Sequence, residues 1–118
     1  MSMDPERLTF HPGDVIFRQD DPGECAYFIE EGSVEIVRDA DGRTLKLGIM
    51  EKRRLLGEIA LIDRGVRSGT ATAKTNVTCL LINREHFDRY LNGLDPLMRM
   101  IIGTLIKYVR TNNEMLQR

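Results

Sequence analysis

The sequence lacks the features that mark several large classes of protein. Its 17 Lys plus Arg are balanced by 18 Asp plus Glu, so the net charge of −1 provides no broad basic field for gripping nucleic acid. No run of about 18 apolar residues could span a bilayer. Residues 1–8 also lack the apolar stretch of a signal peptide. These absences predict a cytoplasmic protein that does not bind nucleic acid through this segment alone.

Groups that commonly carry catalysis or hold metals are also scarce. His11 and His86 are the only histidines, so a histidine-rich metal site of the cupin type lacks its ligands. Cys25 and Cys79 lie far apart among apolar neighbours, which predicts two small buried hydrophobic side chains rather than a disulfide or a metal site. Neither a Gly-x-x-x-x-Gly-Lys-Ser/Thr phosphate loop nor a Gly-x-Gly-x-x-Gly turn occurs. The sequence therefore predicts no enzyme, metal or cofactor.

Short apolar runs alternate with turn signals through the first two thirds of the chain. The period within the runs is two, which is typical of strands, and Asp41-Gly42 between two such runs predicts a tight hairpin. Many short strands followed by helices indicate an antiparallel jelly-roll-like β-roll rather than a parallel α/β sheet. The predicted strands are Val15–Arg18, Ala26–Glu30, Ser33–Arg38, Thr44–Ile49, Thr70–Ala73 and Thr78–Ile82.

The rhythm changes after Asn83, where two helices are predicted over Arg84–Asn92 and Asp95–Arg118. Asp95 is a suitable N-cap, because Pro96 behind it can open a helix. The second helix carries one mainly apolar stripe, which either covers the open face of the sheet, pairs with its copy in a homodimer, or closes over a ligand. The stripe consists of Leu97, Ile101, Leu105, Tyr108, Asn112 and Met115. We expect one domain over residues 1–118, mainly β, with the β-roll at about 8–83 and the helices at about 84–118.

The segment Gly57-Glu58-Ile59-Ala60-Leu61, followed by Arg67-Ser68, has the composition of a binding site. An arginine can hold a phosphate through two parallel N–H donors, whereas a carboxylate so close would repel the phosphate unless it faced a neutral hydroxyl. A ribose phosphate offers both groups. Its anionic end would suit the free N–H groups at the start of a short helix, and Gly57 lets the backbone come close.

The chain resembles the cyclic nucleotide-binding domain family from Phe10 to about Arg118. Phe10–Gln19 is similar to the first strand of that family and Ala26–Ile36 to the next hairpin, while Gly57–Ser68 resembles its phosphate-binding cassette. The resemblance implies that Glu58 accepts a hydrogen bond from the ribose 2′-hydroxyl and that Arg67 pairs with the cyclic phosphate. Backbone N–H groups of the cassette complete the cradle. The implied ligand-binding residues are Gly57, Glu58, Ile59, Ala60, Arg67 and Ser68.

Several positions depart from the family pattern. Lys52-Arg53-Arg54 stands where a glycine and an acidic residue are usual, and we expect a solvated surface loop there. Val66 replaces a common proline and Gly69 a common alanine, which predicts a looser loop around Arg67. Asp20 occupies a usual glycine position, which aspartate tolerates because it adopts left-handed backbone conformations more readily than most residues.

The resemblance favours cAMP over cGMP as the ligand, because Ser68 stands where threonine often accompanies cGMP. Seven side chains could contact the purine, but each also has an ordinary structural explanation. Those in the roll could be core residues, and those in the last helix could be polar surface residues. They are Val34, Leu47, Ile49 and Leu56 from the roll, with Tyr108, Thr111 and Asn112 from the last helix.

Two functions follow as hypotheses. The first is a sensor that binds a cyclic nucleotide and signals by movement of the C-terminal helices. The second is a degenerate domain that keeps the roll and uses its last helix for dimerisation or docking without nucleotide, as the altered loop at Arg53-Arg54 suggests.

Overall fold

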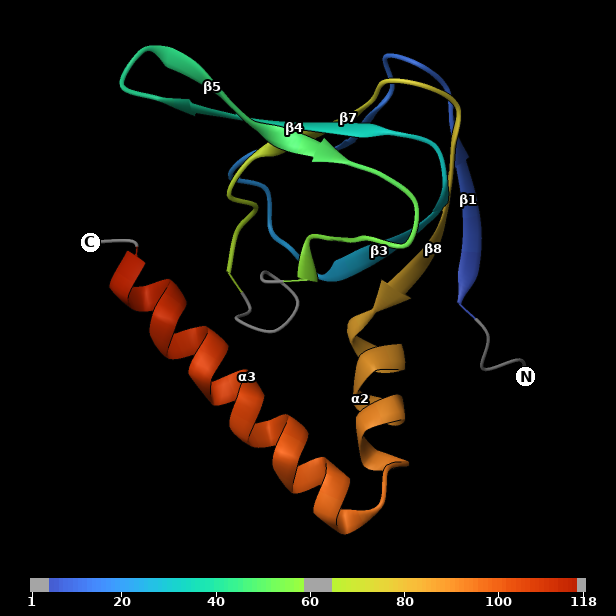
Figure 1. The fold of residues 1–118 in the computed structure, drawn as a ribbon, viewed down its shortest axis with the longest axis vertical. Helices are drawn as coiled ribbons and strands as arrows, with labels where there is room; N and C mark the ends of the chain where they lie inside the picture. The colour runs from blue at the N-terminus through green and yellow to red at the C-terminus, as the bar shows by residue number, and fades with distance from the viewer. Residues whose placement is uncertain (1–4, 59–64, 117–118) are drawn as a thin grey trace.

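The computed structural model of the chain describes residues 5–58 and 65–116. Within these ranges the strands form two four-stranded antiparallel sheets, and two helices follow them (Figure 1). The fold is therefore mainly β with C-terminal helices, as the sequence predicted.

Each sheet combines strands that are distant in sequence. The first sheet contains, in spatial order, β1 (Glu6–Phe10), β8 (Val77–Asn83), β3 (Cys25–Glu31) and β6 (Leu55–Leu56). The second contains β2 (Val15–Phe17), β7 (Thr70–Ala73), β4 (Val34–Ala40) and β5 (Arg43–Met50).

The core of the roll contains side chains from both sheets. Strand alternation places small and branched side chains inward, so that Val34 and Ala71 of one sheet and Ile29 and Cys79 of the other are fully buried. The β4–β5 hairpin turns as predicted at Asp41 and Gly42, whose φ values of 53° and 74° are those that a type I′ turn requires.

Two strands were not predicted from the sequence. β1 is short and its first two residues are exposed, while β6 has only two residues, too few for any periodicity to be visible. The roll accordingly begins at Glu6 instead of about residue 8. The six predicted strands are present, with ends that differ by up to two residues.

The two helices begin as predicted. α2 spans Arg84–Asn92, and its N-cap Asn83 accepts a hydrogen bond from the backbone N–H of His86 at 2.8 Å. α3 spans Pro96–Leu116, and Asp95 Oδ1 accepts from the Leu97 N–H at 2.9 Å, which confirms the predicted N-cap.

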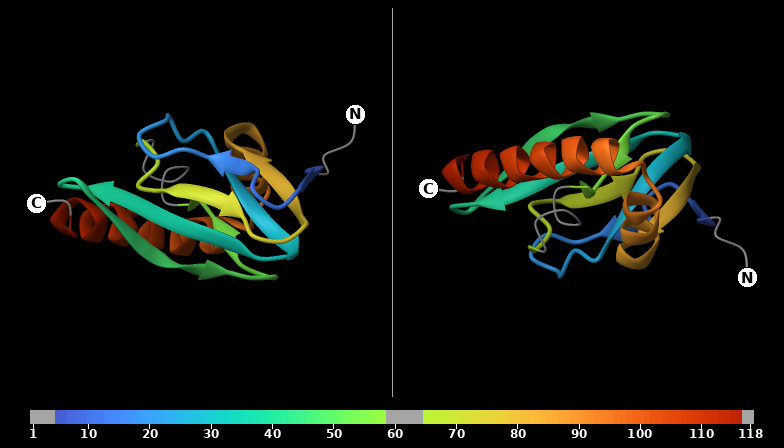
Figure 2. Two further views of the ribbon diagram at one scale, coloured as in Figure 1. Left: turned by 90° about the horizontal axis from the view of Figure 1, so that it is seen from above. Right: turned by 90° about the horizontal axis from the view of Figure 1, so that it is seen from below.

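The apolar stripe of α3 does not cover a sheet within this chain. Figure 1 shows α3 leaving α2 at an angle and running apart from the strands, while the two views of Figure 2 show its long axis following that of the β4–β5 hairpin. Leu97, Ile101, Leu105 and Tyr108 are 43–63% exposed. Of the three roles left open for the stripe, covering the sheet within one chain is excluded for these four residues, because their side chains are exposed.

Among residues 5–58 and 65–116, no helix is long and apolar enough to cross a membrane.

Candidate functional site

The backbone at Arg67 is held by hydrogen bonds to the turn at Asp20 and Asp21, which is distant in sequence. Its N–H donates to Asp21 O at 2.8 Å, and its carbonyl accepts from the Asp20 N–H at 2.9 Å. Pro22 and Val66 form a further antiparallel bridge beside this pair. Asp20 has φ 72°, so the turn takes the left-handed conformation expected for this position.

The Arg67 side chain points into the protein and is only 4% exposed. Its Nη2 donates to the Cys25 carbonyl at 2.7 Å and its Nη1 to the Gly57 carbonyl at 3.2 Å. The guanidinium carbon lies 4.4 Å from the centre of the Phe17 ring, within the range of a cation–π contact. Nε is also buried and has no hydrogen-bond partner within the described part of the chain. A buried cation with donor capacity to spare is suited to an anionic ligand.

Gly57 makes room for this guanidinium. A Cβ at residue 57 would lie 2.1 Å from Arg67 Nη1, and the residue has φ 74° in the left-handed region. Both the backbone conformation and the present position of the neighbouring side chain therefore favour a glycine. The sequence-based expectation that Gly57 lets the backbone approach a ligand stays a prediction, whereas the structure shows the Arg67 guanidinium beside this residue.

The remaining predicted cassette residues are placed as follows. Glu58 follows Gly57 directly and is half-buried, and Ser68 is exposed next to Arg67. Ile59 and Ala60 lie outside the described residues. Glu58 and Arg67 thus come from the two ends of one cassette, and their roles toward a ligand stay predictions.

The predicted purine-contacting residues fall into two groups. Val34 and Leu56 are 0% and 2% exposed and belong to the core, whereas Leu47 and Ile49 are 51% and 42% exposed on β5. Thr111 is exposed on α3, as is Tyr108 with 63% of its surface accessible, while Asn112 lies on the same helix. Their contact with a base stays a prediction.

Two residues around Arg67, Phe17 and Tyr27, were not singled out from the sequence, and a third, Cys25, was predicted only as a buried hydrophobe. Phe17 stacks on Tyr27 with ring centres 6.1 Å apart, and Cys25 supplies both its carbonyl and its Sγ, the latter 3.5 Å from Arg67 Nη2. No sequence signal placed Phe17 and Tyr27 against Arg67.

The two cysteines differ in their surroundings, although both are free thiols. Cys79 is fully buried, as predicted, and burial raises the pKa of its thiol to about 11. Cys25 is only half-buried and is hydrogen-bonded, so its prediction as a plain buried hydrophobe is wrong. Burial raises the pKa of Tyr27, and a side-chain hydrogen bond with Cys25 raises it further.

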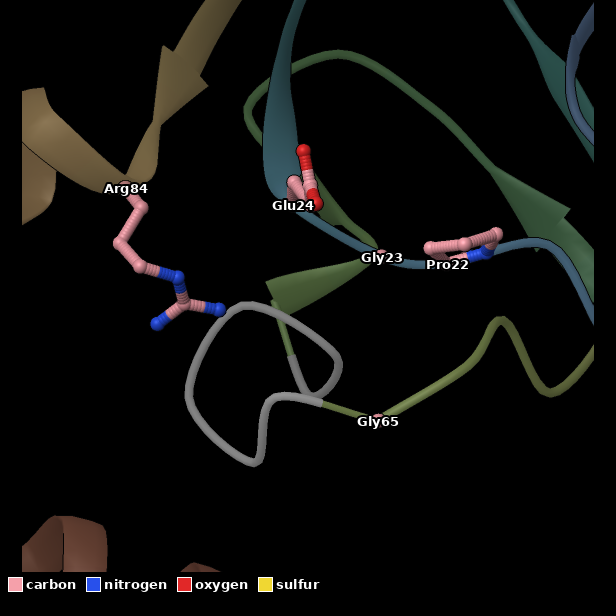
Figure 3. A pocket seen from close by; sticks show the side chains of 5 residues that line it. All are labelled: Pro22, Gly23, Glu24, Gly65 and Arg84. Atoms are coloured by element: carbon pink, nitrogen blue, oxygen red, sulfur yellow. The ribbon is translucent and has the colours of Figure 1, made fainter.

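A pocket of about 230 Å³ opens beside the cassette (Figure 3). Arg84 extends from the start of α2 and Glu24 from the start of β3, so the pocket carries charges of both signs. Its remaining lining consists of Pro22, Gly23 and Gly65. Across the described ranges, no three His, Cys, Asp or Glu side chains are grouped so that they could hold a metal ion.

A family model gives the chain its classification. The model for the cyclic nucleotide-binding domain matches residues 7–93. The chain belongs to this family. The match includes α2 and all strand residues except Glu6, and with them Cys25 and Gly57, whose carbonyls accept hydrogen bonds from the Arg67 guanidinium.

The relatives of this cyclic nucleotide-binding domain include regulators of two kinds. It is 33% identical over 104 residues to the cAMP-dependent protein kinase regulatory subunit of Blastocladiella emersonii, covering 87% of this chain and 26% of that protein. It is 30% identical over 110 residues to the CRP-like cAMP-activated global transcriptional regulator of Mycobacterium tuberculosis, covering 92% of this chain and 49% of that protein. The chain thus spans half or less of the length of these relatives.

Among solved structures, the chain is similar to the EAL enzyme Bd1971 in its half-site-occupied form. The TM-score is 0.85 at 28% identity, with 92% of this chain and 98% of that chain covered.

The departures from the family pattern can be assessed in the structure. Lys52, Arg53 and Arg54 are exposed, as predicted, and Arg53 has φ 70°, so it keeps the left-handed conformation that a glycine would adopt. Gly69 is buried, and a Cβ there would lie 2.7 Å from the Val37 carbonyl oxygen. The prediction that Gly69 loosens the loop is wrong, because the residue allows close packing against β4.

Proposed function

We propose that this domain binds a cyclic nucleotide, cAMP in preference to cGMP, through Glu58 and Arg67. The observation that carries the proposal is Arg67, which is only 4% exposed, lies within the family match and has an Nε without a hydrogen-bond partner among the described residues. The proposal assigns the phosphate to Arg67 and the ribose 2′-hydroxyl to Glu58. Support comes from Bd1971, which has been solved with cAMP and with cGMP bound. The proposed preference for cAMP rests on Ser68, which stands where threonine often accompanies cGMP in the family.

The domain acts as a regulatory module of the cytoplasm and not as an enzyme. Its relatives include a kinase regulatory subunit and a transcriptional regulator by name, and its net charge of −1 does not favour nucleic-acid binding by the domain itself. Ligand binding shifts the position of α3 relative to the roll. Such a shift requires that the ligand bind the two arrangements with different affinity.

Isothermal titration with cAMP and with cGMP tests the binding. The Arg67→Ala variant is expected to bind more weakly by about 2–5 kcal/mol, the cost of removing one member of a buried charge pair. Arg43→Ala provides the matched control, because Arg43 is exposed at the end of the β4–β5 hairpin. Absence of heat with either nucleotide at high micromolar concentration would overturn the proposal, as would equal affinity of the two variants.

Amide hydrogen exchange tests the movement of α3. Addition of cAMP is expected to change exchange within residues 96–116 as well as in the cassette, because α3 changes its packing. A change confined to the roll would contradict signalling through the helix.

A second function is favoured by the exposed apolar side chains of α3, namely dimerisation or docking without nucleotide. Thermal unfolding separates the two functions, because a ligand that binds only the folded state raises the midpoint. A dimer in sedimentation experiments, with no rise of the midpoint in cAMP, would support the second function.

A further inference from the structure

The guanidinium of Arg67 is held on three sides by groups of this chain. Carbonyl oxygens of Cys25 and Gly57 accept from its two terminal nitrogens, at 2.7 and 3.2 Å. The Phe17 ring lies against its face at 4.4 Å from Cζ, while the Tyr27 ring centre is more distant at 6.0 Å. The two carbonyls restrain the directions of Nη1 and Nη2, and the contact with the Phe17 ring restrains the tilt of the guanidinium group.

An irregularity in β2 brings Phe17 into this position. The pairing of β2 with β7 shifts register between Val15 and Phe17, which is the mark of a β-bulge. In a regular strand Ile16 and Phe17 would point to opposite faces. Here Ile16 is buried in the core and Phe17 packs against the same core cluster. Bulges often re-aim a side chain next to a functional site.

The Phe17 ring is itself supported from behind. It stacks on Tyr27 with an interplanar angle of 24°, and Tyr27 makes an edge contact with Phe10 at 6.4 Å. The aromatic residues thus form a rigid wall under the guanidinium. A cation desolvated against such a ring is held more strongly than at an exposed site.

We propose that Phe17 is a positioning residue for the phosphate of the ligand, acting through Arg67. The ring holds the guanidinium so that Nε and the N–H groups not used by the carbonyls are oriented before the ligand arrives. Orientation in advance removes the cost of ordering a long side chain on binding. This inference rests on the proposed function, because it assumes that Arg67 contacts the phosphate.

The test compares three variants by titration with cAMP. Phe17→Leu is expected to weaken binding about tenfold, the size of a lost cation–π contact. Phe17→Tyr, which keeps the ring, is expected to bind within twofold of the unmodified protein. Phe28→Leu makes the same chemical change at the neighbour of Tyr27 on β3, whose side chain alternation directs to the other face, and is expected to leave affinity within twofold. Equal affinity of Phe17→Leu and the unmodified protein overturns the inference, as does an equal loss in both leucine variants.

A second measurement uses the free protein and so separates this inference from the proposed function. The Arg67 Nε–H resonance is expected to lie upfield because of the Phe17 ring current, and to return toward the ordinary arginine position in Phe17→Leu. If the unmodified protein binds neither nucleotide, the proposed function fails. An unchanged Nε–H resonance in Phe17→Leu overturns the positioning role by itself.

Discussion

Replacement of Gly57 by alanine tests whether the buried guanidinium and the cassette glycine depend on each other. The new Cβ would lie 2.1 Å from Arg67 Nη1, well inside contact distance, and would also sit on a residue with φ 74°. Because Nη1 is the end of a long side chain, it can move away. Movement of Arg67 removes its hydrogen bonds to Gly57 and Cys25 and its contact with Phe17.

The cost of Gly57→Ala has two parts. A side chain in the left-handed region costs roughly 1–2 kcal/mol relative to glycine. Loss of the charged hydrogen bond to the Cys25 carbonyl, with weakening of the other contacts, adds about 2 kcal/mol. We expect a decrease of about 3–4 kcal/mol in the free energy of unfolding. In an Arg67→Ala background only the backbone part should remain, so the coupling between the two substitutions is about 2 kcal/mol.

Urea unfolding of the four proteins of this cycle measures the coupling. Gly42→Ala is the matched control, because Gly42 has the same φ of 74° but no atom within 4 Å of an added Cβ. Gly42→Ala should lower the free energy of unfolding by the same amount in the unmodified protein and in Arg67→Ala. That amount should equal only the cost of a side chain in the left-handed region, roughly 1–2 kcal/mol. The reasoning is refuted if Gly57→Ala costs no more than Gly42→Ala, or if its cost is unchanged when Arg67 is absent.

Three further predictions concern stability. Arg53→Gly should raise the free energy of unfolding by about 1 kcal/mol in urea, because φ 70° strains any residue with a Cβ; a decrease would contradict this. Burial raises the pKa of Tyr27 above its ordinary 10.0, so the stability that its neutral form contributes is present below pH 10 and lost only at higher pH. Burial raises the pKa of Cys79 from 9.0 to about 11, so the stability that its thiol contributes is present below pH 9 and lost as pH rises through 11. The difference between the unmodified protein and Cys79→Ala should therefore shrink by up to about 2–3 kcal/mol over that window, whereas parallel profiles would refute it. The Arg7 hydrogen bond lowers the pKa of Glu30 below its ordinary 4.5, so the stability contributed by the Arg7–Glu30 pair is present above pH 4.5 and lost as pH falls through the lowered pKa. The thermal midpoints of Arg7→Met and of the unmodified protein should therefore converge in acid. A difference in midpoint that stays constant with pH would argue against a contribution from this pair.

Local signals in the sequence determined most of the fold. Asp41-Gly42 predicted a hairpin because few residue pairs accept two positive φ values in succession, and Asp95-Pro96 predicted a helix start because the cap and the ring suit its first turn. The two-residue strand β6 was not predicted, because it is defined only by its pairing with β3. The exposure of the α3 stripe was not predicted either, because amphipathicity shows that one face of a helix is apolar but not what that face packs against.

The candidate site was predicted in part. Spacing, charge and the family resemblance predicted that Gly57, Glu58 and Arg67 belong to one cassette, and their roles toward a ligand stay predictions. The surroundings of Arg67 were not predictable, because Phe17 reaches it through a bulge that breaks the alternation of β2, and Cys25 contacts it partly through a backbone carbonyl. Backbone acceptors and register shifts leave no residue-type signature in a single sequence.

A crystal structure of the domain grown with cAMP tests the central claim most directly. We predict a bound nucleotide whose phosphate is within hydrogen-bond distance of Arg67 and whose ribose 2′-hydroxyl donates to Glu58. A structure from saturating cAMP with no nucleotide at the cassette, or with the phosphate out of reach of Arg67, would contradict the claim.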